Sequence, residues 1–528
     1  MQILTSRTIS WVTATLAVAV GCSNTAAPSV AGDAGSADLG APLDTGPALR
    51  PINTDAGQFE QPLVQGLRAT GVALFQSVKV TLSDANGTVA LEDRSAPVVA
   101  NRTTVVRVYV APEAGWVPQS VTAQIILRNE GEAPFNLALT RYVSTASSDA
   151  NPTSVFTFDV PRERVRIGTR LAVQLLAPTG RAAPEGRDNP ARLPADGGTL
   201  DLDVQPNPGT LRVTLVPYIY NTDTSGRLPD TSDLQLQRYR GILTAMYPIE
   251  DVTFTVHAPL TWARPLLSNG SFDFTTMLNE LRNVRRTDGA DDDVYYYGLV
   301  RPSDEFQSYC RRGCVLGQGF VSGQDDVSRR VAGGLGFPGE SSAGTLAHEL
   351  GHLHGRLHAP CGATGTDFAY PHENGALGVW GYDARRRFFF PPGLFDFMSY
   401  CSPEWISDYN YRAIYERVTS VNMPTAQRIV RPDAVTETRS ARLLRWGDGP
   451  LRLDPSPLTL GRDEALSGER RGLRWLDLSG AEIGRGEAVV ERLGEEGSAQ
   501  AVLPTIPTEA RGLALDAGPW GPAQTLRF

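Results

Sequence analysis

The feature that most constrains this chain is residues 348–358, a segment that holds four of its six histidines. The segment reads HELGHLHGRLH, which fits the spacing H-E-x-x-H-x-x-G-x-x-H. On an α-helix, His348 and His352 lie one turn apart on the same face, so both imidazoles can bind one ion. Glu349 is offset from that face and can reach a water on the ion without binding the ion itself. The segment therefore has to begin as a helix that presents one face to a metal ion.

The end of this helix determines the third ligand. Gly355 can adopt a positive φ that ends the helix and turns the chain back. His358 then supplies a third nitrogen, and three protein ligands leave an open position, as a catalytic zinc ion requires. The alternative is an amphipathic helix whose histidines are ordinary polar or core groups, and it leaves the complete spacing unexplained. The sequence predicts Zn²⁺ bound by His348, His352 and His358.

A second segment downstream reads Asp-Phe-Met-Ser-Tyr at 396–400. Together with it, the histidine spacing resembles the metzincin clan of zinc metallopeptidases, whose signature includes a downstream methionine turn. The resemblance implies that Met398 lies in a tight turn beneath the zinc ion. It also implies that Tyr400 binds the metal or stabilises the oxyanion. It covers about residues 206–425 and leaves the subfamily unassigned, because Ala359 after the third histidine matches none of the usual choices.

The resemblance implies a zinc-dependent endopeptidase that acts on a protein or peptide substrate. In that reaction a water on the zinc ion attacks the scissile carbonyl, and Glu349 is the general base. The alternative is an inactive or specialised zinc-containing surface protein that binds a partner through its β-domains, and retention of Glu349 counts against it. A gluzincin-type hydrolase takes its third ligand from a downstream glutamate, which Gly355, His358 and Met398 disfavour.

The first residues have the pattern of an export signal. Arg7 precedes an apolar run at 9–20, which is too short for a typical membrane span. The sequence Ala-Val-Gly-Cys at 19–22 looks like a bacterial lipobox, which predicts a signal peptide at 1–21 and a lipidated Cys22. The alternative is an ordinary secretory signal cut at the same place. Both interpretations predict export, and the lipobox predicts an outer-membrane lipoprotein or cell-surface protein of a Gram-negative bacterium, held to the membrane by its lipid anchor.

The rest of the chain divides by composition and periodicity. Residues 22–62 are rich in Ala, Gly, Ser, Pro, Asp and Thr, which predicts a disordered tether. Short alternating strands predict an immunoglobulin-like β-sandwich over 66–205. Alternating strands and helices predict a partly parallel sheet over 206–425, and short strands predict a small β-domain over 426–528. The expected fold class is multidomain, with an α/β metzincin-like catalytic domain flanked by an N-terminal β-sandwich and a small C-terminal β-domain.

Cysteine content agrees with export. Apart from Cys22, the chain has Cys310, Cys314, Cys361 and Cys401, which in an oxidising compartment suggest two disulfides with three possible pairings. A zinc knuckle built on Cys310 and Cys314 is a weaker alternative, because no second pair lies nearby to complete it. The metzincin resemblance brings the third histidine and the methionine turn together at the metal. It therefore favours Cys361–Cys401, with Cys310–Cys314 as the other pair.

Charge and one further segment bear on the partners. The chain has 49 Lys and Arg against 58 Asp and Glu, a net charge of −9. No net positive field is present to displace counterions, which argues against a nucleic-acid partner.

Residues 314–321 resemble the edge strand that borders the metzincin cleft, and such an edge can pair with an extended substrate backbone. The alternative is a glycine-containing strand in the core.

Overall fold

The computed structural model describes most of the chain after residue 61. The described residues are 62–177, 188–311, 313–363, 365–422, 438–447, 451–454, 457–461, 466–494, 498–518 and 523–528. The predicted signal peptide and Cys22 lie outside them, as does all but the last residue of the predicted tether. Among the described residues, none of the helices is long and apolar enough to cross a membrane.

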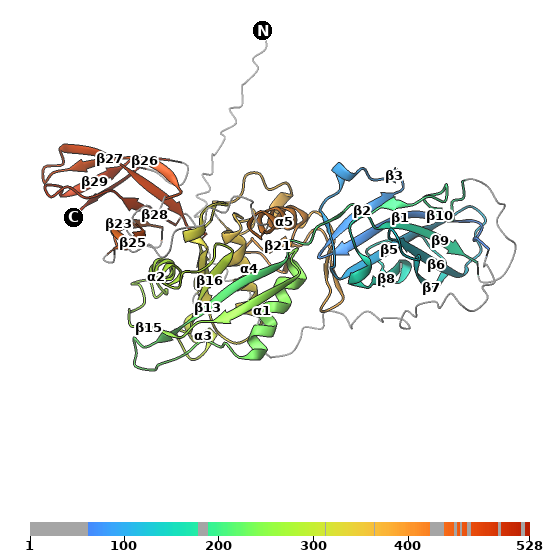
Figure 1. Cartoon of the computed structure of the whole chain (residues 1–528), viewed down its shortest axis with the longest axis horizontal. Coiled ribbons are helices and arrows are strands. Elements are labelled where there is room, and N and C mark those ends of the chain that lie inside the picture. The colour runs from blue at the N-terminus through green and yellow to red at the C-terminus, as the bar shows by residue number, and fades with distance from the viewer. Residues whose placement is uncertain are drawn as a thin grey trace, which may run out of the picture.

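The N-terminal part of the described chain forms two antiparallel sheets, shown in blue and teal in Figure 1. In β6, Val121, Ala123 and Ile125 are buried and alternate with half-exposed polar residues, as expected for a strand with one face in a core. The first sheet contains β1 (Leu67–Gln76), β2 (Val78–Asp84), β3 (Gly87–Thr88), β5 (Thr104–Pro112), β8 (Phe156–Val160), β19 (Gly381–Asp383) and β20 (Phe388–Phe390). The second contains β6 (Gln119–Arg128), β7 (Phe135–Val143), β9 (Arg170–Leu176), β10 (Arg192–Leu193) and β11 (Leu200–Asp201). A separate parallel pair is formed by β4 (Val98–Val99) and β12 (Val204–Gln205).

Strands β19 and β20 come from the segment that the sequence analysis assigns to the catalytic domain, yet they extend the N-terminal sheet at β2. Their aromatic side chains explain this. Phe389 packs edge-on against Phe75 of β1 at a ring-centroid distance of 5.1 Å, and the Arg107 guanidinium lies 3.4 Å from the Phe389 ring centroid. The hairpin therefore completes an apolar surface of the first N-terminal sheet, and sequence periodicity does not indicate this pairing.

The middle of the chain forms a mixed sheet with the order β14-β13-β16-β18-β17. Neighbours from β14 to β18 are parallel, and β17 is antiparallel at the edge. Gly333 and Gly334 are consecutive in β18 (Val331–Leu335), and a Cβ on them would approach Met277 of α2 (Phe274–Thr287) and Thr345 of α4 (Glu340–Leu353) respectively. Because successive strand residues face opposite sides, α2 and α4 cover opposite faces of the sheet.

The elements of this middle part alternate as strands and helices, as Figure 1 shows in green and yellow. Its strands are β13 (Thr210–Tyr220), β14 (Asp251–Val256), β15 (Leu260–Trp262), β16 (Val294–Val300), β17 (Gly317–Gly319), β18 (Val331–Leu335), β21 (Phe395–Asp396) and β22 (Glu404–Trp405). Its helices are α1 (Asp233–Met246), α2 (Phe274–Thr287), α3 (Phe306–Tyr309), α4 (Glu340–Leu353) and α5 (Asp408–Asn422). Short 3₁₀ turns are η1 (Leu91–Asp93), η2 (Pro152–Ser154), η3 (Arg162–Arg164), η4 (Val327–Arg329) and η5 (Glu373–Gly375).

The C-terminal part is an antiparallel sheet, drawn in red in Figure 1, with the order β24-β23-β28-β27-β26-β29-β30 and with β25 on β23. Its strands are β23 (Thr438–Trp446), β24 (Arg452–Leu453), β25 (Leu458–Gly461), β26 (Glu469–Leu476), β27 (Glu482–Arg492), β28 (Ala499–Leu503), β29 (Gly512–Leu515) and β30 (Gln524–Arg527). Most of its buried apolar residues form clusters of their own, whereas one continuous cluster joins the N-terminal and middle parts.

Candidate metal centre

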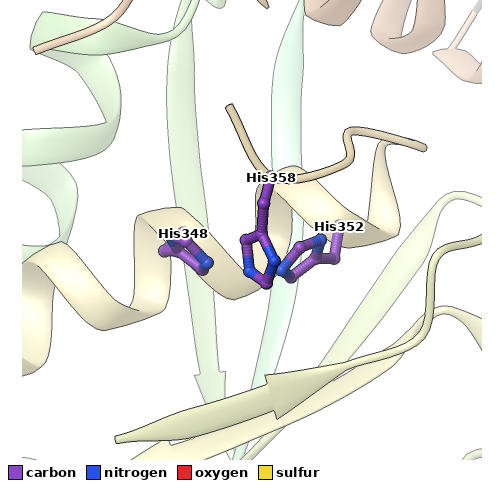
Figure 2. Close-up of side chains that lie close together, drawn as sticks. All are labelled: His348, His352 and His358. Atoms are coloured by element: carbon purple, nitrogen blue, oxygen red, sulfur yellow. The ribbon is translucent and has the colours of Figure 1, made fainter. Parts of the chain in front are cut away.

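Three histidines converge in the middle part of the chain. His348 and His352 lie one turn apart on α4, and His358 comes from the loop that follows this helix (Figure 2). One ring nitrogen of each lies within 4.8 Å of those of the other two. His352 and His358 are 0% and 1% exposed, so the group lies beneath the surface. This is the arrangement that the H-E-x-x-H-x-x-G-x-x-H spacing predicts.

A Schellman motif at the end of α4 brings His358 back toward the helix. Gly355 has a φ of +81°, which glycine adopts without strain. The Gly355 N–H donates to the His352 carbonyl at 2.8 Å, and the Arg356 N–H donates to the Gly351 carbonyl at 3.0 Å. These two bonds define the motif and reverse the chain direction.

Backbone carbonyls orient two of the imidazoles. The Nδ1 of His348 lies 2.8 Å from the Phe397 carbonyl, and the Nδ1 of His352 lies 2.7 Å from the Arg356 carbonyl. When Nδ1 carries the proton, Nε2 presents a lone pair to the centre of the cluster. The Nε2 atoms of His348 and His352 are buried without a hydrogen-bond partner among the described residues. Buried imidazole nitrogens left in this way fit a bound metal ion.

Burial also keeps these imidazoles neutral. It lowers the pKa of His348 to about 4, against a small opposing effect of the hydrogen bond to Phe397. Burial lowers the pKa of His352 well below its ordinary value, and the neighbouring His358 and His348 lower it further. Because a metal binds the neutral form of imidazole, both side chains are in the ligating state at neutral pH.

Met398 lies in a turn beneath α4 and is fully buried. A Cβ on Gly351 would lie 2.4 Å from the Met398 sulfur, so the helix and the turn approach closely only because residue 351 has no side chain. The buried carboxylate of Asp396 holds the turn, since it accepts hydrogen bonds from the Met398 N–H at 2.7 Å and from the Asn410 amide at 2.7 Å. The Ser407 N–H donates to the same carboxylate at 2.9 Å.

Two hydrogen bonds and a disulfide join the turn to the segment after the third histidine. The Ala359 N–H donates to the Met398 carbonyl and the Tyr400 N–H donates to the Cys361 carbonyl, both at 2.9 Å. The Cys361–Cys401 disulfide closes the same contact, with a Cα–Cα distance of 5.7 Å. The Tyr400 ring consequently lies 4.8 Å from the His358 ring and 6.1 Å from the His348 ring, centroid to centroid.

Glu349 is 2% exposed and lies against the edge strand β17. A Cβ on Gly317 would lie 2.7 Å from Glu349 Oε1, and one on Gly319 would lie 2.9 Å from the Glu349 carbonyl. The two glycines therefore allow the helix that carries Glu349 to pack directly on the backbone of the strand. This close approach is a reason for glycine that the sequence alone does not reveal.

The second disulfide joins Cys310 to Cys314, so the structure contains the pairing that the sequence favours. Because both cysteines are bonded, they are not available for a zinc knuckle.

Three residues that position the site were missed from the sequence: Arg356, Asp396 and Asn410. Arg356 Nε donates to Asn410 Oδ1 at 2.6 Å, so they join the helix end to the turn. No spacing pattern marks these residues, since their contacts form only in the folded chain.

Comparison with known families gives an independent observation on the same segment. Residues 323–404 match the family model Peptidase M66. The Peptidase M66 match contains the three histidines, Glu349, Met398 and Tyr400, and it supports a metallopeptidase. It leaves residues 1–322 and 405–528 unmatched. No curated protein matches this chain.

Proposed function

We propose that this protein is an exported zinc-dependent endopeptidase. The observation that carries the proposal is the convergence of three imidazoles, two buried and one half-buried, beside Glu349, inside the segment that matches Peptidase M66. His348, His352 and His358 would hold the ion, and three nitrogen ligands are the donor set of many catalytic zinc sites. When bound, zinc polarises a carbonyl oxygen and lowers the pKa of a nearby water.

Glu349 is the general base and acid of the proposed reaction. Its carboxylate takes a proton from the attacking water and delivers it to the amine that leaves. Glu349 is buried against β17, so its carboxylate lies close to any backbone that pairs with this strand. The Tyr400 hydroxyl donates a hydrogen bond to the oxyanion that develops on the scissile carbonyl. The closeness of the Tyr400 ring to the His358 ring supports this role.

The edge strand β17 is the proposed binding site for the substrate backbone. One side of the strand pairs with β18 through the register Gly317↔Gly334 to Gly319↔Ala332. An extended peptide could form main-chain hydrogen bonds with the other side, which gives affinity with little dependence on side chains. The proposed substrates are therefore proteins or peptides that present an extended segment.

We further propose a metzincin-like catalytic domain on an outer-membrane lipoprotein. The turn at Met398 beneath the helix of the ligands supports the first part. The lipobox ending at Cys22 supports the second part, and the two disulfides fit an oxidising compartment. The membrane contact is then made by the lipid, and the net charge of −9 gives no reason to expect a nucleic-acid partner.

Peptide-library cleavage by the zinc-loaded mature chain tests the proposal. We expect Glu349→Gln to reduce kcat/KM at least about 1000-fold while zinc content stays at one per chain, because the variant loses proton transfer and keeps all three ligands. Glu92→Gln removes an exposed carboxylate of the N-terminal sandwich and should leave cleavage unchanged. A zinc-loaded protein that cleaves no peptide would instead favour a surface protein that binds its partner through the β-domains.

A further inference from the structure

The C-terminal sheet reaches the metal centre through residues 492–494, at the end of β27. Leu493 forms an antiparallel bridge with Phe320, directly after the edge strand β17. The Val321 N–H donates to the Arg492 carbonyl at 3.2 Å, and the Gly494 N–H donates to the Gly319 carbonyl at 2.7 Å. These residues therefore pair with the last residue and with the continuation of the strand that we propose to bind the substrate.

Gly494 lies directly against a metal-ligating imidazole. A Cβ on Gly494 would lie 2.3 Å from Cδ2 and 2.6 Å from Nε2 of His352. No side chain fits at this distance, so the position admits only glycine while His352 keeps its place. The C-terminal sheet is thus in contact with the metal site itself and not only with its surroundings.

Further contacts fix residues 492–494 in this position. The Arg492 guanidinium donates to the Gly365 carbonyl, in the segment that follows the third histidine. The preceding residue, Glu491, is 0% exposed and pairs with Arg282 of α2 at 2.8 Å. The Gln500 amide donates to Glu491 at 2.7 Å. A buried network of this kind holds its partners in one geometry, which indicates a permanent contact.

The direction of this pairing decides what it excludes. Residues 492–494 run antiparallel to the continuation of β17, from Arg492 beside Val321 to Gly494 beside Gly319. A substrate that pairs antiparallel with β17 runs in the same direction and has its scissile bond near the three histidines. Its residues N-terminal to that bond would have to occupy the space where Arg492, Leu493 and Gly494 lie.

We propose that residues 492–494 determine specificity by closing the cleft on the N-terminal side of the scissile bond. The substrate class is then a polypeptide cut close to its free N-terminus, with most of its length on the C-terminal side. This inference rests on the proposed peptidase function. It gives the C-terminal sheet a part in the active site, although the Peptidase M66 match ends at residue 404.

A shortened hairpin tests the inference. Replacing residues 493–498 by Asn-Gly leaves the Arg492↔Ala499 pair of β27 and β28 to close a two-residue turn. It also keeps Glu491 and Gln500, which hold the sheet on α2. The matched control replaces residues 477–481, the exposed turn at the other end of β27, by the same dipeptide between Leu476 and Glu482.

The substrates are nested peptides that share one scissile sequence and differ in length on the N-terminal side. In the parent protein and in the control variant, we expect kcat/KM to fall about tenfold or more as this extension grows. The variant with the shortened hairpin should instead cleave peptides of all lengths with the same kcat/KM. Binding gives a second readout that needs no catalysis. When both proteins carry Glu349→Gln, the variant with the shortened hairpin should bind the longest peptide about tenfold more tightly than the protein with the full-length hairpin, as measured by fluorescence anisotropy.

Equal dependence on peptide length in the parent and the shortened hairpin, in either readout, would overturn the inference while leaving the peptidase function intact. Failure of the peptidase function has a different signature, since the zinc-loaded parent would then cleave no peptide at any length. The anisotropy comparison would still decide whether residues 492–494 exclude extended peptides. If the shortened hairpin fails to fold, Arg492→Ala removes the contact with Gly365 and should shift both readouts in the same direction by a smaller factor.

Discussion

At the scale of single residues, Gly355 connects backbone conformation to the metal ligands. We expect Gly355→Ala to destabilise the protein by about 1–2 kcal/mol from its positive φ alone. A Cβ would also lie 2.7 Å from the Arg417 guanidinium and 3.2 Å from the Ser322 carbonyl oxygen, so either Arg417 or the loop has to move. Because His358 follows this loop, zinc affinity should fall about tenfold or more. Thermal unfolding of the metal-free protein and competition with a chelator measure the two effects.

Gly226 provides the matched control for that variant. It has a φ of +64° in an exposed turn, and nothing lies within 4 Å of the Cβ position. Gly226→Ala should therefore show the cost of the backbone conformation without a change in zinc affinity. Equal zinc affinities in wild type and Gly355→Ala would show that the helix end does not position the third ligand.

The three histidines were predictable because their spacing follows from the period of one helix and a single reversal. The contacts that support these histidines were not predictable from the sequence. Arg356, Asp396 and Asn410 meet by hydrogen bonds between the helix end, the methionine turn and α5, and no local pattern encodes such contacts. Gly494 lies far along the sequence from His352, so its glycine has a reason only after the sheets have packed.

At the scale of elements, the Cys361–Cys401 disulfide joins the segment after His358 to the turn that contains Met398. The chain-entropy estimate for its sequence separation of 40 is about 4 kcal/mol, against about 2 kcal/mol for the separation of four in Cys310–Cys314. We expect the double variant Cys361→Ser/Cys401→Ser to lose more thermal stability than Cys310→Ser/Cys314→Ser. Only the first variant should also bind zinc more weakly, because only that bridge contacts the site.

Calorimetry and chelator competition on the two double variants check this expectation. Similar zinc affinities in both would mean that the paired bonds at Ala359 and Tyr400 hold the turn without the bridge. The alternation of strands and helices over 206–425 predicts a partly parallel sheet, and the neighbours from β14 to β18 are parallel. The place of the β19–β20 hairpin does not follow from this alternation, because its pairing with β2 depends on aromatic packing with Phe75 and not on its own pattern.

At the scale of the whole molecule, the three parts are joined at two interfaces of different chemistry. Toward the N-terminus one buried apolar cluster runs through the N-terminal and middle parts, and the buried Arg102 guanidinium donates to the Ile249 carbonyl at 2.9 Å. The Trp405 indole N–H adds a hydrogen bond to the Ser77 carbonyl at 2.9 Å. Toward the C-terminus the contact is polar, since Asn279 and Arg282 of α2 bond to Gln500 and Glu491.

A carboxylate at this polar interface predicts how the stability of the interface depends on pH. Burial alone raises the pKa of Asp273, but the ion pair and hydrogen bond with Arg445 and the two hydrogen bonds from Thr276 together outweigh burial and hold the pKa below its ordinary value of 3.8. The stabilisation from this carboxylate is therefore complete above its unfolded pKa and is lost as the pH falls through the folded value. The interface should stay intact at neutral and mildly acidic pH.

Arg282→Ala tests the contribution of the interface directly. The side chains of Arg282 and Glu491 are 3% and 1% exposed, so the variant leaves a buried carboxylate without its guanidinium and should cost about 3–5 kcal/mol. The amides of Val321 and Gly494 bond across the same contact, and their hydrogen exchange should become faster. Arg485→Ala breaks an exposed ion pair with Glu482 on the same strand and should change neither quantity. Unchanged exchange at both amides in Arg282→Ala would mean that residues 492–494 keep their pairing with residues 319–321 without the network on α2.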